Sequence, residues 1–384
     1  MKGVTRLFFE LTEEQKAIQE KARDYAKNRL AAVQEEGEKT GEFHTKEIVS
    51  EMGKMGFHGG VIPKEYGGTE AGFLSIILVV EQIARISPSY SMLPAGQTVG
   101  PGLALLRLGT KEQKDKYVPG LTNGDIFAGF YSTEPDAGSD LSLMKTMAVE
   151  KDGNYVLNGN KTWATGATEA DMGLFWAWTD KEKGIREGIS CFIVDLKDTP
   201  GIYTSDIGKL GLACDEVGEI AFNDVKIPKG NLLGELGAGY GYLMDLLANT
   251  RLCAGARALG VHGACLDDCI NFIKGRGRNV ENYQMLQSKV AEMHIEYQAA
   301  RMLVYQAAAN KDRNTTTPID VPTAKFFACE AAVRAVELTM GIQSCFGVPQ
   351  DAQLRRFLND SRAFPTTEGT RNILRLAIGG QLLR

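Results

Sequence analysis

The pattern of hydrophobic and polar positions changes twice along the 384-residue chain. In the first third, apolar residues recur at helical spacing, and the first long segment opens with the capping-box sequence Thr12-Glu13-Glu14-Gln15. Further helices are predicted at 46–55, 74–86, 102–108 and 111–121. The turn signal Asn123-Gly124 ends this pattern, so we expect an N-terminal helical domain over residues 1–123.

The middle of the chain has the pattern of short strands separated by turn residues. Strands are predicted at 127–131, 144–149, 155–157, 162–165, 174–178, 190–194 and 219–222. Asp152-Gly153, between two of these segments, is a strong hairpin signal. Closely spaced strands of this kind are typical of a small antiparallel barrel or sandwich, which we place at residues 124–233.

The last third returns to helical spacing, with long helices predicted at 242–273, 283–311 and 321–346. Long helices with short connections are typical of a four-helix bundle, here over residues 234–384. In the final helix Ile373, Leu376, Ala377 and Gly380 stand at i, i+3, i+4 and i+7, which predicts one packed face that fixes Glu368 at the helix start. The predicted fold class is therefore α+β, mostly α, in the order helices, β-domain, helices.

Composition and charge exclude several classes of protein. Hydrophobic residues make up 43% and charged residues 24%, which is typical of a globular protein. A formal net charge of −5 disfavours a nucleic-acid binder, and the longest apolar run, 73–80, is too short to cross a bilayer. Seven scattered cysteines without a CxxC pair predict free thiols and no metal site. Residues 1–11 lack the pattern of a signal peptide, so we expect a cytoplasmic protein.

Three polar segments are candidates for chemistry. Residues 131–140 combine hydroxyl groups with turn-forming residues, which can hold an anion or the polar edge of a ring. Trp163 offers a flat face, and Thr165, two residues further along a strand, should lie on the same side. Glu368 precedes a helix and could act as a general base. Each segment alone also fits an ordinary turn, a core tryptophan or a first-turn acid.

Taken together, the three segments resemble the acyl-CoA dehydrogenase family. The matching stretches are Thr133-Glu134-Pro135-x-Ala137-Gly138-Ser139-Asp140, Asn158-Gly159-x-Lys161-x-Trp163-x-Thr165 and Glu368-Gly369-Thr370. They occur in the family's order, and the resemblance extends over nearly the whole chain. It implies FAD as cofactor, an acyl-CoA substrate, an electron-transfer flavoprotein as electron acceptor, a homotetramer and a role in fatty or carboxylic acid degradation.

The resemblance also implies roles for single residues. Glu368 matches the catalytic base of most members; the base position used by other members is Thr250 here, which cannot act as a base near neutral pH. The implied FAD contacts within the motifs are Tyr131, Thr133, Ser139, Trp163, Thr165, Thr370 and Asn372. The implied residues on the substrate side are Ser91, Ser139, Thr250, Arg251, Thr367 and Gly369. A flavin ribityl hydroxyl and the main-chain amide of Glu368 are implied to stabilise the enolate of the thioester.

Two stretches that grip the FAD of a neighbouring subunit in the family are altered. The Arg-x-Phe-Gly stretch reads Lys274-Gly275-Arg276-Gly277, and the Gln-x-x-Gly-Gly-x-Gly stretch reads Gly341-Ile342-Gln343-Ser344-Cys345-Phe346-Gly347. Lys274 and Arg276 can still pair with a pyrophosphate. The alternative is an FAD-poor partner subunit of a hetero-oligomer.

The substrate is predicted from what the pocket lacks. Ser91 stands where glutaryl-CoA-specific members have an arginine for the distal carboxylate, and without that cation a second buried carboxylate would cost several kcal/mol. Thr367 replaces a usual tyrosine and removes bulk beside the base, while Ala248 replaces a usual polar residue near the CoA arm. We therefore expect a branched or alicyclic, non-dicarboxylic acyl-CoA such as cyclohexanecarboxyl-CoA. The alternatives are an enoyl-CoA reductase working in reverse and a flavin monooxygenase, which would not need Glu368.

Overall fold

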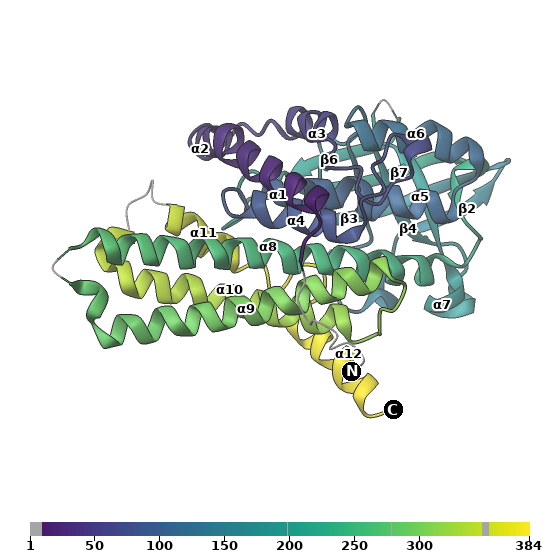
Figure 1. Ribbon diagram of the computed structural model, residues 1–384. Coiled ribbons are helices and arrows are strands. Elements are labelled where there is room, and N and C mark those ends of the chain that lie inside the picture. Colours follow the sequence, from purple (N-terminus) through teal and green to yellow (C-terminus); the bar gives the residue numbers. More distant parts are fainter. Residues whose placement is uncertain (1–9, 198, 278, 348–352) are drawn as a thin grey trace.

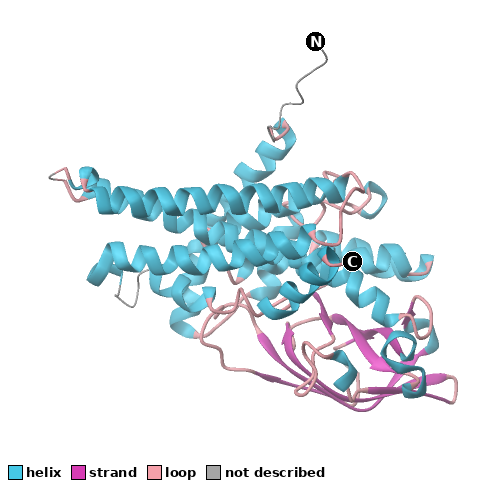
Figure 2. Ribbon diagram, turned by 90° about the horizontal axis from the view of Figure 1, so that it is seen from below, coloured by secondary structure: helices cyan, strands magenta, loops and turns pink. Residues whose placement is uncertain are grey.

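The order of helices, sheet and helices that the sequence predicts is confirmed in the computed structural model (Figure 1). The structure describes residues 10–197, 199–277, 279–347 and 353–384. The sheet lies against one side of the helices (Figure 2). Within the described ranges, no helix combines the length and the apolar composition that a membrane crossing requires.

The N-terminal third is built from short helices around one buried helix. Its helices are α1 (Glu13–Tyr25), α2 (Ala31–Thr40), α3 (Thr45–Lys54), α4 (Phe73–Ala84), α5 (Leu103–Leu108) and α6 (Lys111–Asn123), with π-helical segments at Ala26–Leu30 and Ala95–Gly102. The predicted capping box at Thr12 is present, and Thr110 forms a second one. Every residue of α4 is buried, so the longest apolar run of the chain forms a core helix.

The middle of the chain forms one sheet of eight strands. They are β1 (Ala128–Tyr131), β2 (Met147–Lys151), β3 (Asn154–Thr165), β4 (Met172–Trp178), β5 (Ile189–Asp195), β6 (Ile202–Asp206), β7 (Val217–Pro228) and β8 (Leu232–Leu233), with the short helix α7 (Gly184–Gly188) between β4 and β5. The order is β6-β7-β3-β2-β4-β5-β8, and β1 pairs with β4. The pairs β1–β4 and β2–β4 are parallel, so the sheet is mixed and the expectation of a purely antiparallel barrel or sandwich is corrected.

Local sequence signals explain most of the strands that were found, whereas β6 and the two-residue β8 were not predicted. Asp152 and Gly153 both have positive φ, of 49° and 78°, as a two-residue hairpin between β2 and β3 requires. Two predicted strands, 155–157 and 162–165, are parts of the single strand β3. The edge strand β6 was not predicted because four of its five residues are exposed and polar or aromatic, so it has no buried face to recognise.

The C-terminal third consists of long helices that lie side by side (Figure 1). They are α8 (Gly239–Gly275), α9 (Gln284–Asp312) and α10 (Asp320–Gln343), followed by the shorter α11 (Gln353–Ser361) and α12 (Arg371–Leu382). The helical domain predicted at the C-terminal end is confirmed, and its core also includes buried residues of α4, which belong to the same core cluster as those of α8, α9, α10 and α11.

Within one chain, the face predicted to pack on the last helix is covered only in part. Leu374 is the one buried residue of α12, whereas Leu376 is 70% exposed and Gly380 is also exposed. Helical spacing shows which residues share a face, but it does not show whether another element covers that face. Glu368 must therefore be held in place by contacts other than the packing of α12.

Candidate active site

Glu368 lies in a tight turn between α11 and α12, which we call the Glu368 loop (residues 366–370). Its φ is +55°, and φ of Gly369 is +101°, so two consecutive residues adopt left-handed backbone conformations. For a residue with a side chain this conformation costs about 1–2 kcal/mol and has to be enforced by its surroundings. Thr370 caps α12 by accepting a hydrogen bond from the amide of Ile373 at 3.4 Å. The glutamate thus precedes the helix rather than belonging to its first turn.

Helix α8 contacts the Glu368 loop at its side chain and at its backbone. The hydroxyl of Thr250 donates to Glu368 Oε2 at 2.5 Å, and Arg251 Nε donates to the main-chain oxygen of Glu368 at 3.0 Å. Arg257, two turns further along α8, donates to Thr367 Oγ1 at 2.9 Å. The structure therefore brings together Thr250, Arg251, Thr367 and Glu368, four residues that the sequence placed at one site.

Helix α10 adds a contact that the sequence did not predict. Lys325 has no exposed surface, and its Nζ donates to the main-chain oxygen of Gly369 at 2.8 Å. Burial lowers the pKa values of both Lys325 and Arg251 from their ordinary range. Among the described residues, neither cation forms a salt bridge with a carboxylate. Two side-chain cations therefore donate to main-chain oxygens of the Glu368 loop, while among the described residues the Glu368 carboxylate forms no salt bridge.

Trp163 lies at an irregularity of β3. Its φ is +55°, its side chain is 61% exposed, and the register with β7 shifts between Lys161 and Ala164. The regular strand that we expected at Trp163 is interrupted by this bulge, but Ala164 between Trp163 and Thr165 is buried while both flanking residues are at least partly exposed. That these two residues share one side therefore stays a prediction. Bulges often reorient a side chain next to an active site, and an exposed indole in a strained backbone fits that use.

The loop at 131–140 is tied to β3 by a buried ion pair. Lys161 Nζ and Glu134 Oε1 are 2.8 Å apart, and both side chains are almost fully buried. Burial alone would raise the pKa of Glu134, but the Lys161 ammonium and the amides of Lys145 and Thr146 hold it below its usual range. Sequence reasoning quoted Glu134 and Lys161 as motif positions without a role. Nothing in the strand pattern singles out Lys161, because β3 contains exposed as well as buried positions.

The predicted FAD contacts in this region differ in exposure. Tyr131 is buried, packs against Phe175 and donates its hydroxyl to the main-chain oxygen of Thr165 at 2.9 Å. Burial raises the pKa of Tyr131. Thr133 is half-buried and Ser139 is exposed. Tyr131 therefore holds the backbone at Thr165 through its hydroxyl group, whereas the side chain of Ser139 is exposed at the surface.

Two predicted residues lie far from the Glu368 loop. Lys274 is in the last turn of α8 and Arg276 directly follows the helix, about 36 and 39 Å from Thr250 along the helix axis at 1.5 Å per residue. The Arg276 guanidinium lies 5.0 Å from the ring of Phe346 and 5.6 Å from that of Phe272. No single FAD reaches from one end of this helix to the other, so within one chain these cations and Glu368 cannot contact the same cofactor.

Ser91 is placed in the core rather than at a cavity surface. Its side chain is buried, and its hydroxyl donates to the main-chain oxygen of Pro88 at 2.7 Å. Near Thr250, a small cleft of about 30 Å³ separates α8 from the segment that leads into α5. Its lining includes Asn249 and Tyr242 on one side and Val99 on the other. The substrate role predicted for Ser91 thus has no exposed hydroxyl to support it.

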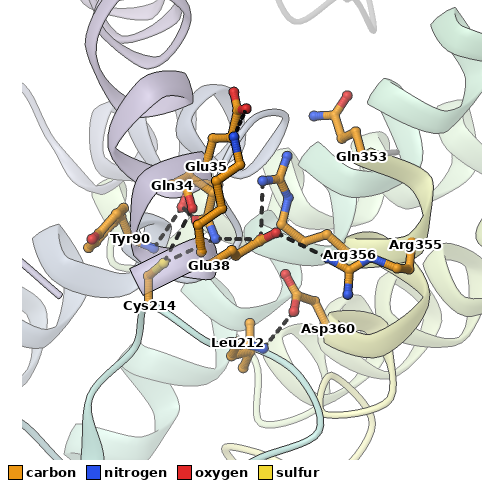
Figure 3. Close-up of polar contacts among 12 residues, drawn as sticks. Gln34, Glu35, Glu38, Tyr90, Leu212, Cys214, Gln353, Arg355, Arg356 and Asp360 are labelled. Carbon is orange, nitrogen blue, oxygen red and sulfur yellow. Dashed lines mark hydrogen bonds and ion pairs between the residues drawn. The ribbon is translucent and has the colours of Figure 1, made fainter. Parts of the chain in front are cut away.

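The three thirds of the chain meet beside the Glu368 loop. In Figure 3, Gln34 of α2 and Cys214, which follows β6, lie close to Asp360 of α11. Gln34 donates to the Cys214 sulfur at 3.2 Å, and Asp360 accepts from the amide of Leu212 at 2.5 Å. The second oxygen of Asp360 has no partner among the described residues, and burial raises the pKa of Asp360 to about 7. This junction fixes α11, which leads directly into the Glu368 loop.

These features fit a flat cofactor bound between the sheet and the Glu368 loop. An exposed indole and a threonine on β3, hydroxyls at 131–140 and the capped start of α12 can together contact a heteroaromatic ring and its polar edge. Family models match the chain at residues 12–125, 129–225 and 237–383, as the N-terminal, middle and C-terminal domains of acyl-CoA dehydrogenase. The chain belongs to the acyl-CoA dehydrogenase family. It is a flavoenzyme of acyl-CoA dehydrogenation, and FAD is the cofactor of the family.

Individual relatives match over nearly their whole length. A glutaryl-CoA dehydrogenase of Desulfococcus multivorans is 36% identical over 376 residues, covering 96% of each chain. The CarC subunit of the caffeyl-CoA reductase–Etf complex of Acetobacterium woodii is 35% identical, covering 97% of this chain and 99% of its own. The structure of PigA with FAD and proline superposes with a TM-score of 0.93 at 27% identity, covering 98% of this chain and 99% of that one.

Proposed function

We propose that Glu368 is the catalytic base of this enzyme and removes the α-proton of an acyl-CoA thioester. The observation that supports this most is the arrangement of charge around the Glu368 loop. Lys325 and Arg251 donate to main-chain oxygens, and the Glu368 carboxylate accepts one hydrogen bond among the described side chains, from Thr250. A carboxylate that is held in place but not paired with a cation keeps its ability to accept a proton.

The other site residues have positioning roles in this proposal. FAD, when bound, accepts the hydride from Cβ of the substrate. Trp163, Thr165, Tyr131, Thr133 and Ser139 hold or support the flavin from the sheet side, and Thr370 and Asn372 contact FAD from α12. The amide of Glu368 donates to the thioester oxygen and stabilises the enolate. Thr367 and Gly369 line the acyl group beside the base.

We propose a branched or alicyclic acyl group without a second carboxylate, for instance cyclohexanecarboxyl. Ser91 offers no cation and no free hydroxyl, and Thr367 is small, which leaves room beside Glu368. The relatives include a glutaryl-CoA dehydrogenase and a caffeyl-CoA reductase, so the family resemblance alone fixes neither the acyl group nor the direction. Reduction of an enoyl-CoA at the same site is the second candidate, favoured by the reductase relative.

We further propose a homotetramer that passes electrons to an electron-transfer flavoprotein. The distance between Glu368 and the end of α8 supports the first part, because Lys274 and Arg276 can contact FAD only if that FAD belongs to another subunit. The Etf complex of the caffeyl-CoA reductase relative supports the second part. The competing proposal remains an FAD-poor partner subunit in a hetero-oligomer.

The test counts FAD per polypeptide in the chain expressed alone, and then follows bleaching of the flavin under anaerobic conditions. The panel contains cyclohexanecarboxyl-CoA, isobutyryl-CoA, butyryl-CoA and glutaryl-CoA. We expect about one FAD per chain and fastest bleaching with the ring or branched substrate. Bleaching by butyryl-CoA but not by either bulky substrate would refute the substrate proposal. A colourless protein that takes up no added FAD would refute the homotetrameric enzyme and favour the partner-subunit alternative.

A further inference from the structure

Lys325 is a fully buried lysine to which the proposed chemistry assigns no role. It lies on α10, none of its surface is exposed, and its ammonium donates to the main-chain oxygen of Gly369 at 2.8 Å. The described residues offer it no carboxylate at ion-pair distance. A buried ammonium that is paired only with a neutral carbonyl is an expensive arrangement in a protein core. Such a residue needs a reason beyond packing.

The Glu368 loop is closed by a backbone hydrogen bond from the amide of Arg371 to the main-chain oxygen of Pro365 at 3.0 Å, and its strained turn lies inside this closure. Glu368 and Gly369 both have positive φ, and α12, which follows them, buries Leu374 alone. Arg251 holds the main-chain oxygen of Glu368 from α8, and Lys325 holds the next one from α10. The consecutive carbonyl groups of Glu368 and Gly369 are therefore fixed from two different helices.

The two helices form a rigid base for these contacts. A methyl group at Gly255 of α8 would lie 3.4 Å from Cα of Lys325, so the helices approach closely at this level. Most neighbouring residues of α10, including Ala324 and Ala328, belong to the main core cluster. The aliphatic part of the Lys325 side chain is thus immobilised in the core, and its ammonium group holds the loop at a fixed position relative to the core.

We propose that Lys325 is a positioning residue for the base. By holding the Gly369 carbonyl it fixes the left-handed turn and thereby the direction of the Glu368 side chain, and because it donates to a main-chain oxygen it leaves the carboxylate unpaired. Charge-assisted hydrogen bonds are about twice as strong as neutral ones, which suits a contact that must hold a strained turn. The inference rests on the proposed role of Glu368 as the base.

The test compares Lys325→Met with Arg334→Met in the FAD-loaded enzyme. Arg334 is a cation on the same helix that pairs with Glu296 of α9 at 2.7 Å, outside the proposed site. We expect kcat of K325M to fall about 10- to 100-fold, as loss of one charge-assisted hydrogen bond implies, while KM changes less than about threefold. Its Tm should stay level or rise, because an apolar side chain replaces a buried charge. R334M should keep the wild-type kcat.

A second readout needs no turnover. Amide hydrogen exchange of a peptide that spans residues 366–371, measured without substrate, should accelerate roughly tenfold in K325M and stay unchanged in R334M. If none of the acyl-CoAs bleaches the flavin of the wild-type enzyme, the proposed function fails. The hydrogen-exchange measurement still decides whether Lys325 holds the loop. Wild-type kcat and wild-type exchange in K325M would overturn the inference, as would a kcat loss matched by equal losses of FAD and Tm. Should K325M not fold, K325Q, which keeps a donor but no charge, carries the same comparison.

Discussion

Two fully buried lysines, Lys161 in the sheet and Lys325 in the bundle, hold the two sides of the site in different ways. Lys161 pairs with the carboxylate of Glu134 at 2.8 Å, whereas Lys325 donates to the main-chain oxygen of Gly369 at the same distance. The first arrangement neutralises both charges and ties two segments of the same domain together. The second leaves the lysine without a salt bridge among the described residues, close to a carboxylate that the chemistry needs.

The difference shows that the partner of a buried cation decides whether a nearby carboxylate is occupied as a structural acceptor or remains available as a base. In the sheet, the amides of Lys145 and Thr146 add to the ion pair, so Glu134 is fully occupied as a structural acceptor. At the Glu368 loop, two cations hold backbone atoms, and among the described residues the carboxylate accepts its hydrogen bond from the neutral hydroxyl of Thr250. A carboxylate bonded like Glu134 would be a poor base, because ionic and hydrogen-bonded stabilisation of the charged form opposes protonation.

The largest expected effect comes from removing the unpaired carboxylate. Glu368→Gln keeps the size of the side chain and an acceptor for Thr250, so FAD content and Tm should remain as in the wild type. The rate of flavin bleaching by acyl-CoA, measured by stopped flow, should fall about 10²–10⁴-fold because general base catalysis is lost. A rate within tenfold of the wild type would show that another group takes the proton. The different bonding of the Glu134 and Glu368 carboxylates would then not explain which of them acts as the base.

The next effect concerns stability and the ion pair. Lys161→Met leaves the Glu134 carboxylate buried and unpaired, which should lower the free energy of unfolding by about 3–5 kcal/mol. The double variant Lys161→Met/Glu134→Leu should recover most of this loss, because an apolar pair can replace a buried ion pair. Urea unfolding of the wild type, K161M and the double variant measures the loss and its recovery, and K325M is measured in the same way. Equal losses in K161M and K325M would contradict the distinction between the two lysines.

Sequence reasoning reached the helix–β–helix order and the segments that meet at the site, but not the contacts that hold them. The capping box at Thr12 and the hairpin at Asp152-Gly153 are local signals and were predicted correctly. The bulge at Trp163 depends on pairing with β7, about 55 residues later, and so left no local trace. In the sequence Lys325 is one of several charged residues of α10, and nothing distinguishes it until its distance to Gly369 is known.

Other expectations from the sequence remain predictions. The domain limits 1–123, 124–233 and 234–384 and the roles assigned to single site residues, including Lys274 and Arg276, depend on ligands and neighbouring subunits. Leu376 is an example. It is exposed in the single chain, and whether its face of α12 is packed depends on a neighbouring subunit, which the sequence pattern does not reveal.

A smaller effect is expected at the junction beside the loop. Burial raises the pKa of Asp360 from 3.8 to about 7. Between these values the folded protein holds a proton that the unfolded chain has lost, so this residue makes the wild type less stable as pH rises toward 7. Asp360→Asn does not titrate and keeps an acceptor for the Leu212 amide. Its advantage in unfolding free energy should therefore grow by about 2–3 kcal/mol from pH 5 to pH 8. An advantage that does not change with pH would contradict this assignment.

The smallest effect tests the single side-chain contact of the base. Thr250→Val removes the hydroxyl that donates to Glu368 Oε2 at 2.5 Å but keeps the shape of the side chain. Loss of one positioning hydrogen bond of about 0.5–1.5 kcal/mol should lower kcat/KM by two- to tenfold, far less than Glu368→Gln. Thr250→Ser retains the hydroxyl and should stay within about twofold of the wild type. If T250V keeps the wild-type kcat/KM while T250S is slow, the methyl group rather than the hydrogen bond is what Thr250 contributes, and the base is positioned from its backbone alone.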